Sequence, residues 1–465
     1  MRYSSTRGQA PVQDFAGVLL AGLANDGGLY MPETWPRFSA AELRALRGLP
    51  YPELAAHVMA PFVGESIAFT DLQAMCRRAY AGFTHKAIVP LVQLDTNIFA
   101  LELFHGPTLA FKDMALQLVG HLFEHVLKER GEKIRIVGAT SGDTGSAAIE
   151  AVAGRKNIDI TILHPAGKTS EVQRRQMTTV RADNVLNVAV DGNFDDCQDL
   201  IKAMFADVQF RTEMNLSAVN SINFARIAAQ IPYYIYAALN LGAPDREMAV
   251  AVPTGNFGNI LAAWAAKQMG VPIARFIVAS NRNDILARFL HANDMSVQGV
   301  EPSVSPSMDI QVSSNFERLL YEFMHRDAPM TAQAMAEFRH TGKMTVPDTI
   351  WRAISRDFSG FRLEDDETLT EIARTYRETG YLADPHTAIG LAAAREKAPV
   401  GLPVIVAATA HPAKFPDAIE KAVGFRPPLP SHLSDLYERQ EVFTRAPNDL
   451  AVIEACVRNF ANRNA

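Results

Sequence analysis

The sequence predicts an α/β protein built around parallel β-sheet. Several short runs rich in β-branched and apolar residues have the length and composition of buried strands. They are residues 132–140, 158–165, 183–190, 247–254, 273–280 and 403–410. Between most of them lie stretches with helical spacing, namely 145–154, 169–180, 195–207 and 259–270. Because strands and helices alternate, the strands should run parallel, with helices covering both faces of the sheet.

Composition and charge are those of an ordinary globular protein. The 465 residues are 48% hydrophobic and 21% charged, with a net charge of −6, so the chain has no general attraction for nucleic acid or anionic membrane. No apolar run approaches about 18 residues, and the first residues lack the apolar stretch of a signal peptide. The three cysteines are far apart, with neither disulfide nor metal spacing. We therefore expect a cytoplasmic protein that uses no metal.

Pattern and length divide the chain into three regions. Residues 1–95 are expected to form a mainly helical N-terminal domain, and residues 431–465 a helical C-terminal tail. The α/β region spans residues 96–430. Within it, residues 282–380 break the alternation and are expected to form a helical insertion.

One lysine stands among apolar residues. Pro107 and Thr108 suit the start of a helix that carries Lys112. At about 100° per residue, Lys112 falls on the apolar arc of this helix. Its companions there are Leu116, Val119, Phe123 and Val126, whereas the polar arc holds Asp113, Gln117, His121, Glu124 and Lys128. Two interpretations stay open: a lysine that extends its amine to water from the helix edge, or a buried nucleophile with a lowered pKa.

A glycine-rich turn follows the strand expected at 247–254. Gly255 and Gly258 bracket Asn256 and Phe257, and a helix should begin near Asn259. Glycines before a helix N-terminus let backbone N–H groups converge on an anion, so the turn suits a phosphate. The spacing fits neither a P-loop nor G-x-G-x-x-G, which argues against triphosphate and nicotinamide sites. A tight turn without a ligand is the other interpretation.

Two further strand ends carry polar residues. Thr140, Ser141, Asp143 and Thr144 crowd one short turn before a helix. Their hydroxyls, with free N–H groups at the helix start, can hold a carboxylate, although simple capping is the alternative. Thr409 stands at another strand end, where it can make one hydrogen bond. In open parallel sheets, ligands bind beyond the carboxyl ends of the strands.

These groups together indicate one cofactor. A phosphate cradle, a carboxylate pocket, a hydroxyl and a lysine in apolar surroundings would all be used by pyridoxal 5′-phosphate. The lysine would form a Schiff base with its aldehyde, and the ring would act as an electron sink.

Nine segments, in order along the chain, match a known family. They are MRYSSTRG, GLANDGGLYMP, LFHGPTLAFKD, VGATSGDTGSAA, VNSINFARIAAQIPYY, VPTGNFGNILA, MDIQVSSNFERLL, DPHTAIG and ATAHPAKF. With them the sequence resembles the threonine synthases, pyridoxal-phosphate enzymes of the tryptophan-synthase-β-like fold type II. The match runs from residue 1 to about residue 415. It implies that residues 96–430 form a catalytic region of two α/β lobes.

The resemblance implies a role for each matching residue. Lys112 corresponds to the Schiff-base lysine, and Thr409 to the hydroxyl beside the pyridine nitrogen. The loop whose backbone amides bind the cofactor phosphate corresponds to Gly255, Asn256, Phe257, Gly258 and Asn259. The substrate carboxylate is expected on Thr140, Ser141 and Thr144, and the substrate phosphate on Asn220, Ser221 and Arg226.

Asp143 is a departure from the pattern, because many relatives of this fold have asparagine there. The resemblance implies that Asp143 lies beside the cofactor ring oxygen and the substrate carboxylate. An anionic aspartate would be repelled by both, so we expect Asp143 to be protonated or to point away.

The implied function is conversion of O-phospho-L-homoserine and water to L-threonine and phosphate, a pyridoxal-phosphate-dependent β,γ-elimination and replacement that ends threonine biosynthesis. The alternative is a related phospholyase or a threonine or serine dehydratase, although the phosphate pocket around Arg226 argues against a plain dehydratase. A non-catalytic relative is disfavoured by the intact lysine and loops. The expected partner is a small-molecule substrate, with no nucleic acid or membrane, and the protein should be a monomer or homodimer.

Overall fold

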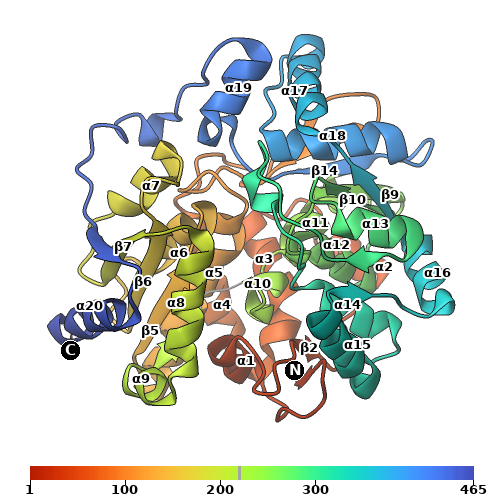
Figure 1. Ribbon diagram of the computed structural model, residues 1–465. Coiled ribbons are helices and arrows are strands. Elements are labelled where there is room, and N and C mark those ends of the chain that lie inside the picture. The colour runs from red at the N-terminus through yellow and green to blue at the C-terminus, as the bar shows by residue number, and fades with distance from the viewer. Residues whose placement is uncertain (218–220, 465) are drawn as a thin grey trace. The chain divides into compact units, whose positions relative to one another are not determined.

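The computed structural model describes residues 1–217 and 221–464. The chain divides into two compact units, and Figure 1 labels many of their helices and strands. Unit 1 comprises residues 1–19, 23–106 and 221–427, and unit 2 comprises residues 20–22, 107–220 and 428–465. None of the helices in the described residues is long and apolar enough to cross a membrane.

Unit 1 is built on a six-stranded sheet with the order β13–β10–β9–β14–β4–β3. In that order the strands are Phe358–Arg362, Ile273–Ser280, Met248–Pro253, Val404–Ala408, Ile98–Glu102 and Leu91–Gln93. All neighbouring pairs are parallel except β3 with β4. Every residue of the central strands β9 and β14 is buried, as expected for strands covered on both faces. The predicted parallel arrangement is confirmed.

The edge strand β13 lies in the segment 282–380, which was expected to be mainly helical. Its sequence FSGFR is short and contains a glycine, so it carries a weak strand signal. The glycine has a packing reason: a Cβ on Gly360 would lie 2.8 Å from the Cα of Ala287 in helix α13 (Ile285–Ala292). Close approach of that helix to the sheet therefore requires the glycine.

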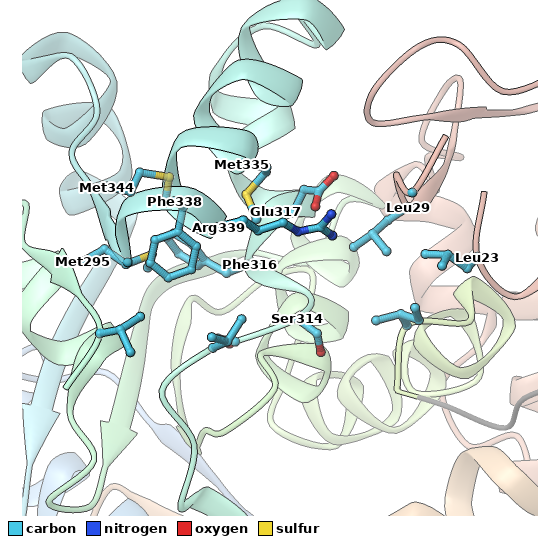
Figure 2. Close-up of a pocket in the computed structure, with 16 residues that line it drawn as sticks. Leu23, Leu29, Met295, Ser314, Phe316, Glu317, Met335, Phe338, Arg339 and Met344 are labelled. Atoms are coloured by element: carbon cyan, nitrogen blue, oxygen red, sulfur yellow. The ribbon is translucent and has the colours of Figure 1, made fainter. Parts of the chain in front are cut away.

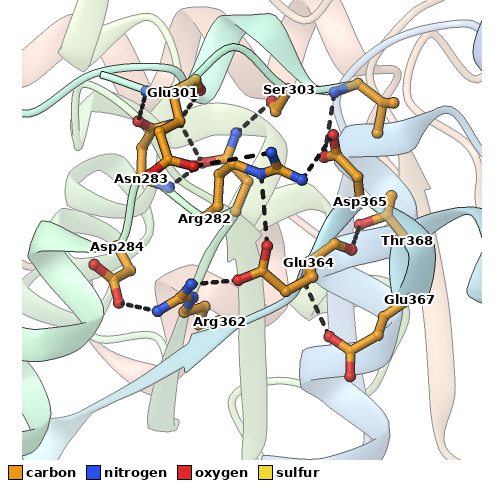
Figure 3. Close-up of polar contacts among 12 residues, drawn as sticks. Arg282, Asn283, Asp284, Glu301, Ser303, Arg362, Glu364, Asp365, Glu367 and Thr368 are labelled. Atoms are coloured by element: carbon orange, nitrogen blue, oxygen red, sulfur yellow. Dashed lines mark hydrogen bonds and ion pairs between the residues drawn. The ribbon is translucent and has the colours of Figure 1, made fainter. Parts of the chain in front are cut away.

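An ion-pair cluster joins the carboxyl ends of β10 and β13, as Figure 3 shows. Arg282, just after β10, lies 3.1 Å from Asp365 and 3.5 Å from Glu364 at the start of helix α17 (Asp365–Thr379). Arg362, at the end of β13, pairs with Asp284 at 3.1 Å and with Glu364. These contacts fix the loops that leave this edge of the sheet.

Unit 1 also contains many helices. The N-terminal part contributes α1 Phe15–Ala21, α2 Ala40–Ala45, α3 Tyr51–Val63 and α4 Phe69–Tyr80. Later helices are α10 Phe224–Ala228, α11 Ile231–Asn240, α12 Gly258–Gln268, α14 Phe316–Phe323, α15 Ala328–Thr341, α16 Asp348–Asp357, α18 Pro385–Lys397 and α19 Pro416–Val423. Two small antiparallel pairs complete the unit: β1 Tyr3–Ser5 with β2 Tyr30–Pro32, and β11 Met295–Ser296 with β12 Lys343–Met344.

Unit 2 has its own parallel five-stranded sheet, in the order β15–β7–β6–β5–β8. In that order the strands are Thr444–Pro447, Val185–Asp191, Ile158–Pro165, Ile134–Ala139 and Leu216–Ser217. Its helices are α5 Lys112–Arg130, α6 Asp143–Val152, α7 Glu171–Thr178, α8 Phe194–Ala206, α9 Val208–Glu213 and α20 Leu450–Arg463. The last helix fits the expected helical tail, but the tail also supplies β15 to the sheet, which the sequence did not signal.

Candidate active site

The loop at 255–259 leads from β9 into α12 and leaves its amides available to an anion. The first N–H groups of a helix have no acceptor within the helix, and they carry the positive end of its dipole. Phe257 has φ 62°, a left-handed conformation that is rare for a residue with a side chain. Its ring is only 1% exposed and packs edge-on against Phe316 at 5.2 Å. Buried packing therefore holds the strained turn in one shape.

A second segment, at 313–315, binds the carbonyl side of the same loop. The Ser313 hydroxyl donates to the carbonyl of Gly255 at 2.7 Å, and the Asn315 backbone and side-chain N–H groups both donate to the carbonyl of Asn256. The Asn315 side chain also donates to the carbonyl of Ser221 at 3.0 Å. With these carbonyls occupied, the amides are left for a ligand. This segment was not predicted to be part of the site.

Gly255 needs to be a glycine because another backbone lies against it. A Cβ there would be 2.8 Å from the carbonyl oxygen of Ser307. A Cβ on Gly258 would lie 3.2 Å from the Ile227 side chain and 3.5 Å from the side-chain nitrogen of Asn315. Larger side chains at either position would therefore displace the loop.

Asn259 offers a buried donor in the first turn of α12. Its side-chain oxygen accepts hydrogen bonds from the hydroxyls of Tyr233 at 2.7 Å and Tyr234 at 2.6 Å. Burial raises the pKa of both tyrosines well above the usual value, so both remain neutral donors. The side-chain nitrogen of Asn259 is buried and has no partner among the described residues. An N–H group left unpaired in this way costs free energy unless a ligand accepts from it.

Thr409 follows β14 and is hydrogen-bonded to a buried cluster of Asp384, His386 and Thr387, called the hub below. Its backbone N–H donates to the hydroxyl of Thr387 at 3.2 Å, and that hydroxyl donates to the carboxylate of Asp384. Asp384 also accepts from the backbone N–H groups of Thr387 and His386 at 3.1 Å and from His386 Nδ1 at 2.7 Å. His386 Nε2 accepts from the backbone N–H of Ser307 at 3.2 Å, which assigns the ring proton to Nδ1.

This hub joins three parts of unit 1. It caps helix α18, fixes the strand end at Thr409, and holds the segment at Ser307 that lies against Gly255. Neither Asp384 nor His386 was predicted to be part of the site. The D-P-H-T order was the available signal, because it places a carboxylate, an imidazole and a hydroxyl within one helical turn.

Arg226 lies on α10 and is 5% exposed. Its Nε and Nη1 atoms are buried and have no hydrogen-bond partner among the described residues. Burial lowers its pKa to about 10, so the guanidinium is still charged at neutral pH. Ser221, on the chain just before this helix, is half-buried and hydrogen-bonds through its hydroxyl with Ser314 at 3.3 Å. Asn220, expected beside it, lies outside the described residues.

Lys112 is the first residue of α5 in unit 2, and its side chain is 12% exposed. Its Nζ lies 3.3 Å from Asp143 Oδ2 and 4.9 Å from the centre of the Phe111 ring. The sequence predicted a helix start at Pro107 and Thr108, but the helix begins at Lys112. Thr108 instead donates through its N–H and its hydroxyl to the buried carboxylate of Asp113. The assignment of Asp113 to a polar, solvent-facing arc was therefore wrong.

The carboxylate of Asp143 contacts two side chains of unit 2. Its Oδ1 accepts from the Gln173 side chain at 2.8 Å while Oδ2 faces Lys112. The neighbouring Gly142 has φ 153°, and a Cβ there would lie 2.5 Å from the Gln173 side chain. Gln173 was not predicted as part of the site, since it comes from α7, thirty residues along the chain.

The rest of this turn combines scaffold and exposed groups. The Thr140 hydroxyl accepts from the N–H groups of Gly142 at 3.0 Å and Gly145 at 2.9 Å, which shapes the turn. Ser141 is exposed and Thr144 is half-buried. Unit 2 thus carries Lys112 and the expected carboxylate-binding turn, while unit 1 carries the amide loop, Thr409 and Arg226.

Comparison with known proteins identifies the family. A family described as "Threonine synthase N terminus" matches residues 2–80, and "Threonine synthase, C-terminal" matches residues 387–457. "Pyridoxal-phosphate dependent enzyme" matches residues 87–407, more than half of the chain. The threonine synthase of Pseudomonas aeruginosa is 54% identical over 465 residues, covering 100% of this chain and 99% of the relative. The chain belongs to the threonine synthase family.

Solved structures of the threonine synthase family agree with this assignment. The pyridoxal-phosphate-bound threonine synthase of Brucella melitensis is 53% identical, with a TM-score of 0.98 and 99% of each chain covered. The yeast threonine synthase is 38% identical, with a TM-score of 0.94 and the same coverage. The expected fold type is confirmed, and the threonine synthase family depends on pyridoxal 5′-phosphate.

The residues present fit this cofactor. The loop at 255–259 provides amides and an unpartnered Asn259 N–H for a phosphate, with no cation needed. Lys112 is mostly buried, beside an aromatic ring and a carboxylate, which suits an amine that must bind an aldehyde. Among the described residues no cluster could hold a metal ion.

Proposed function

We propose that the protein converts O-phospho-L-homoserine and water to L-threonine and inorganic phosphate, and is therefore a carbon–oxygen lyase acting on a phosphate ester. The observation that carries this proposal is Arg226, a buried guanidinium with two N–H atoms unpartnered among the described residues. Burying a charge without a counter-ion costs several kcal/mol, so this arrangement suits a ligand that brings an anion. A substrate phosphate is such an anion, and guanidinium binds it in a bidentate manner.

The phosphate read by Arg226 is proposed to be that of the substrate. The cofactor phosphate has its own amide loop at 255–259. Asn315 ties that loop to Ser221, and Ile227, next to Arg226, lies against Gly258. Arg226 therefore belongs to the segment beside the loop without being part of it. In our proposal Asn220 and Ser221 assist in binding the same phosphate.

When bound, pyridoxal phosphate supplies an electron sink for a carbanion at the substrate Cα. We assign the proton transfers to Lys112 Nζ, which takes the Cα proton and serves the neighbouring carbons in later steps. Asp143 and Gln173 position that amine in the absence of ligand. Ser141 and Thr144, with the amides at the start of α6, are proposed to bind the substrate carboxylate. We propose that Thr140 supports them by shaping the turn, and that the Thr409 hydroxyl would hydrogen-bond to the pyridine nitrogen.

Product analysis with variants at Arg226 tests the proposal. We expect threonine and phosphate in equal amounts from O-phospho-L-homoserine, whereas a keto acid with ammonia would indicate a phospholyase or dehydratase. Arg226→Met should lower turnover at least tenfold, since a charge-assisted contact is worth about 1.5–3 kcal/mol. The cofactor absorption band should persist. Arg458→Met, at a side chain 38% exposed, is the matched control.

A thermal measurement separates substrate binding from a structural role. Inorganic phosphate should raise the unfolding temperature of the wild-type protein but not that of Arg226→Met. Without phosphate, the variant should be at least as stable as the wild type, because it removes an unpaired buried charge. A strongly destabilised variant would show instead that Arg226 holds the fold. We further propose that the protein is cytoplasmic and that it is a monomer or homodimer. The mass of the native particle tests the oligomeric state.

A further inference from the structure

An apolar cavity in unit 1 is lined in part by Ser313 and Ser314, from the segment that binds the amide loop at 255–259. Its volume is about 640 Å³, within the range of small-molecule sites. Figure 2 shows methionine, phenylalanine and leucine side chains around it. The apolar lining comes from Leu23, Leu29, Ile222, Met295, Val297, Val312, Phe316, Met335, Phe338 and Met344. Methionines make such a wall adaptable, because their unbranched side chains fill irregular gaps.

Two charged residues line this cavity, and only one of them is neutralised. Glu317 accepts two hydrogen bonds from Arg7, at 3.1 and 2.9 Å, and one from Thr6 at 2.6 Å. Arg339, on α15, reaches toward Leu29 (Figure 2) and makes no ion pair within 1–217 and 221–464. Arg339 is exposed to solvent, so the cavity has a hydrated positive charge, without an ion-pair partner among the described residues, beside its apolar walls.

One wall of the cavity is hydrogen-bonded to the amide loop. Ser313 and Ser314 line the cavity, and their hydroxyls bind Gly255 and Asn256 at 2.7 and 3.1 Å. An occupant that packs against Val312 and Ser313 would therefore restrict the segment on which the loop depends.

We propose that this cavity binds an amphipathic monocarboxylate, with its carboxylate on Arg339 and its hydrocarbon chain among the methionines, and that its binding slows release of the cofactor. Charge complementarity selects the head group, and the apolar lining selects the tail. The binding step is independent of the proposed reaction. The effect on cofactor release rests on the proposed role of the loop at 255–259, so the two are measured separately.

Calorimetric titration of the holoenzyme with hexanoate, octanoate and decanoate tests binding. We expect one site per chain, with affinity rising about fourfold for each added methylene. Decylamine, which has the same number of carbon atoms and the opposite charge, should bind at least tenfold more weakly than decanoate. Equal binding of decylamine and decanoate would overturn the proposal, as would an affinity that does not depend on chain length.

Two pairs of variants locate the site. Arg339→Gln should weaken decanoate binding about tenfold, whereas Arg352→Gln, at a 74% exposed side chain on α16, should not. Met335→Trp should fill the cavity and abolish binding, whereas Met330→Trp, an exposed position on the same helix and outside the cavity, should leave it intact. The unfolding temperature of each variant checks its fold. If Met335→Trp instead abolishes a concentration-dependent dimer and decanoate does not bind, the cavity is a contact between copies and the proposal is wrong.

Coupling to the loop is measured as the half-time of cofactor release from the holoenzyme. Saturating decanoate should lengthen it at least threefold, and Arg339→Gln should lose this effect. An unchanged half-time at full occupancy would overturn the coupling while leaving the binding site established.

Discussion

The hub at Asp384 can be tested by removing a single charge without changing the shape of the side chain. In Asp384→Asn, one oxygen is kept for the N–H and hydroxyl of Thr387. The other oxygen becomes an NH₂ group, which faces two donors of His386, its backbone N–H and its ring Nδ1–H. Switching the ring proton to Nε2 does not solve this conflict, because Nε2 already accepts from the N–H of Ser307.

The cost follows from counting the donors left unpaired. Each buried donor without an acceptor costs about 1–3 kcal/mol, and no ring tautomer satisfies both sides. We expect Asp384→Asn to cost about 2–4 kcal/mol. At about 1.5 °C per kcal/mol for a unit of about 310 residues, the unfolding temperature of unit 1 should fall by roughly 3–6 °C. Loss of order at Thr409 and Ser307 should also weaken cofactor retention.

The assay compares two caps of the same kind. Asp449 caps α20 of unit 2 by accepting from Val452 at 3.1 Å, with no histidine on its other oxygen. Because asparagine is as good an N-cap as aspartate, Asp449→Asn should change stability little. Calorimetric scans and equilibrium dialysis of cofactor are run on both variants. In Asp384→Asn combined with His386→Leu, the ring donor is gone, so the double variant should be less destabilised than the sum of the singles. If Asp384→Asn behaves like Asp449→Asn, the reasoning is refuted.

Three further outcomes are expected. Borohydride reduction followed by peptide mapping should place the cofactor on Lys112, and label on another lysine would contradict the assignment. Gly258→Val should lower cofactor occupancy more than unfolding temperature, since the new side chain meets the Asn315 amide that shapes the loop; full occupancy would place the phosphate elsewhere. Burial raises the pKa of Glu150 from 4.5 to about 7, so its contribution to stability is complete below pH 4.5 and is lost as pH rises through 7. Glu150→Gln should therefore gain up to about 2–3 kcal/mol over wild type at pH 8 and little at pH 5, and equal stabilities at both pH values would disprove the shift.

The central strands of both sheets could be predicted because their signal is local. Runs such as residues 158–165 and 247–254 are apolar over a strand's length, and each proved to be a buried strand. The strand at Phe358–Arg362 was missed because a glycine and an arginine interrupt a short run, and its reason for being a strand is the neighbouring β10. Tertiary pairing of this kind leaves little trace in composition.

The candidate site divides along the same line. Lys112 and the loop at 255–259 could be singled out, because an amine on an apolar arc and glycines at a helix start have local physical reasons. Gln173 and Asn315 could not, since they act on residues 30 and 59 positions away. The placement of Asp113 failed for a related reason: a polar residue was assumed to face water, whereas its partner Thr108 satisfies it inside the protein.

In our proposal, the loop at 255–259 binds the cofactor phosphate with groups that cannot titrate. Its side chains are those of glycine, asparagine and phenylalanine, and the contacts that shape it come from serine and asparagine. The contribution of the loop to phosphate binding should therefore be constant over the whole pH range in which the protein stays folded. Any pH dependence of cofactor release should follow the protonation of the cofactor phosphate itself. Substitutions should therefore be tolerated unequally within the loop. Positions that set the path of the backbone, such as Phe257 and Gly255, should accept few other residues, although neither side chain is proposed to contact the ligand.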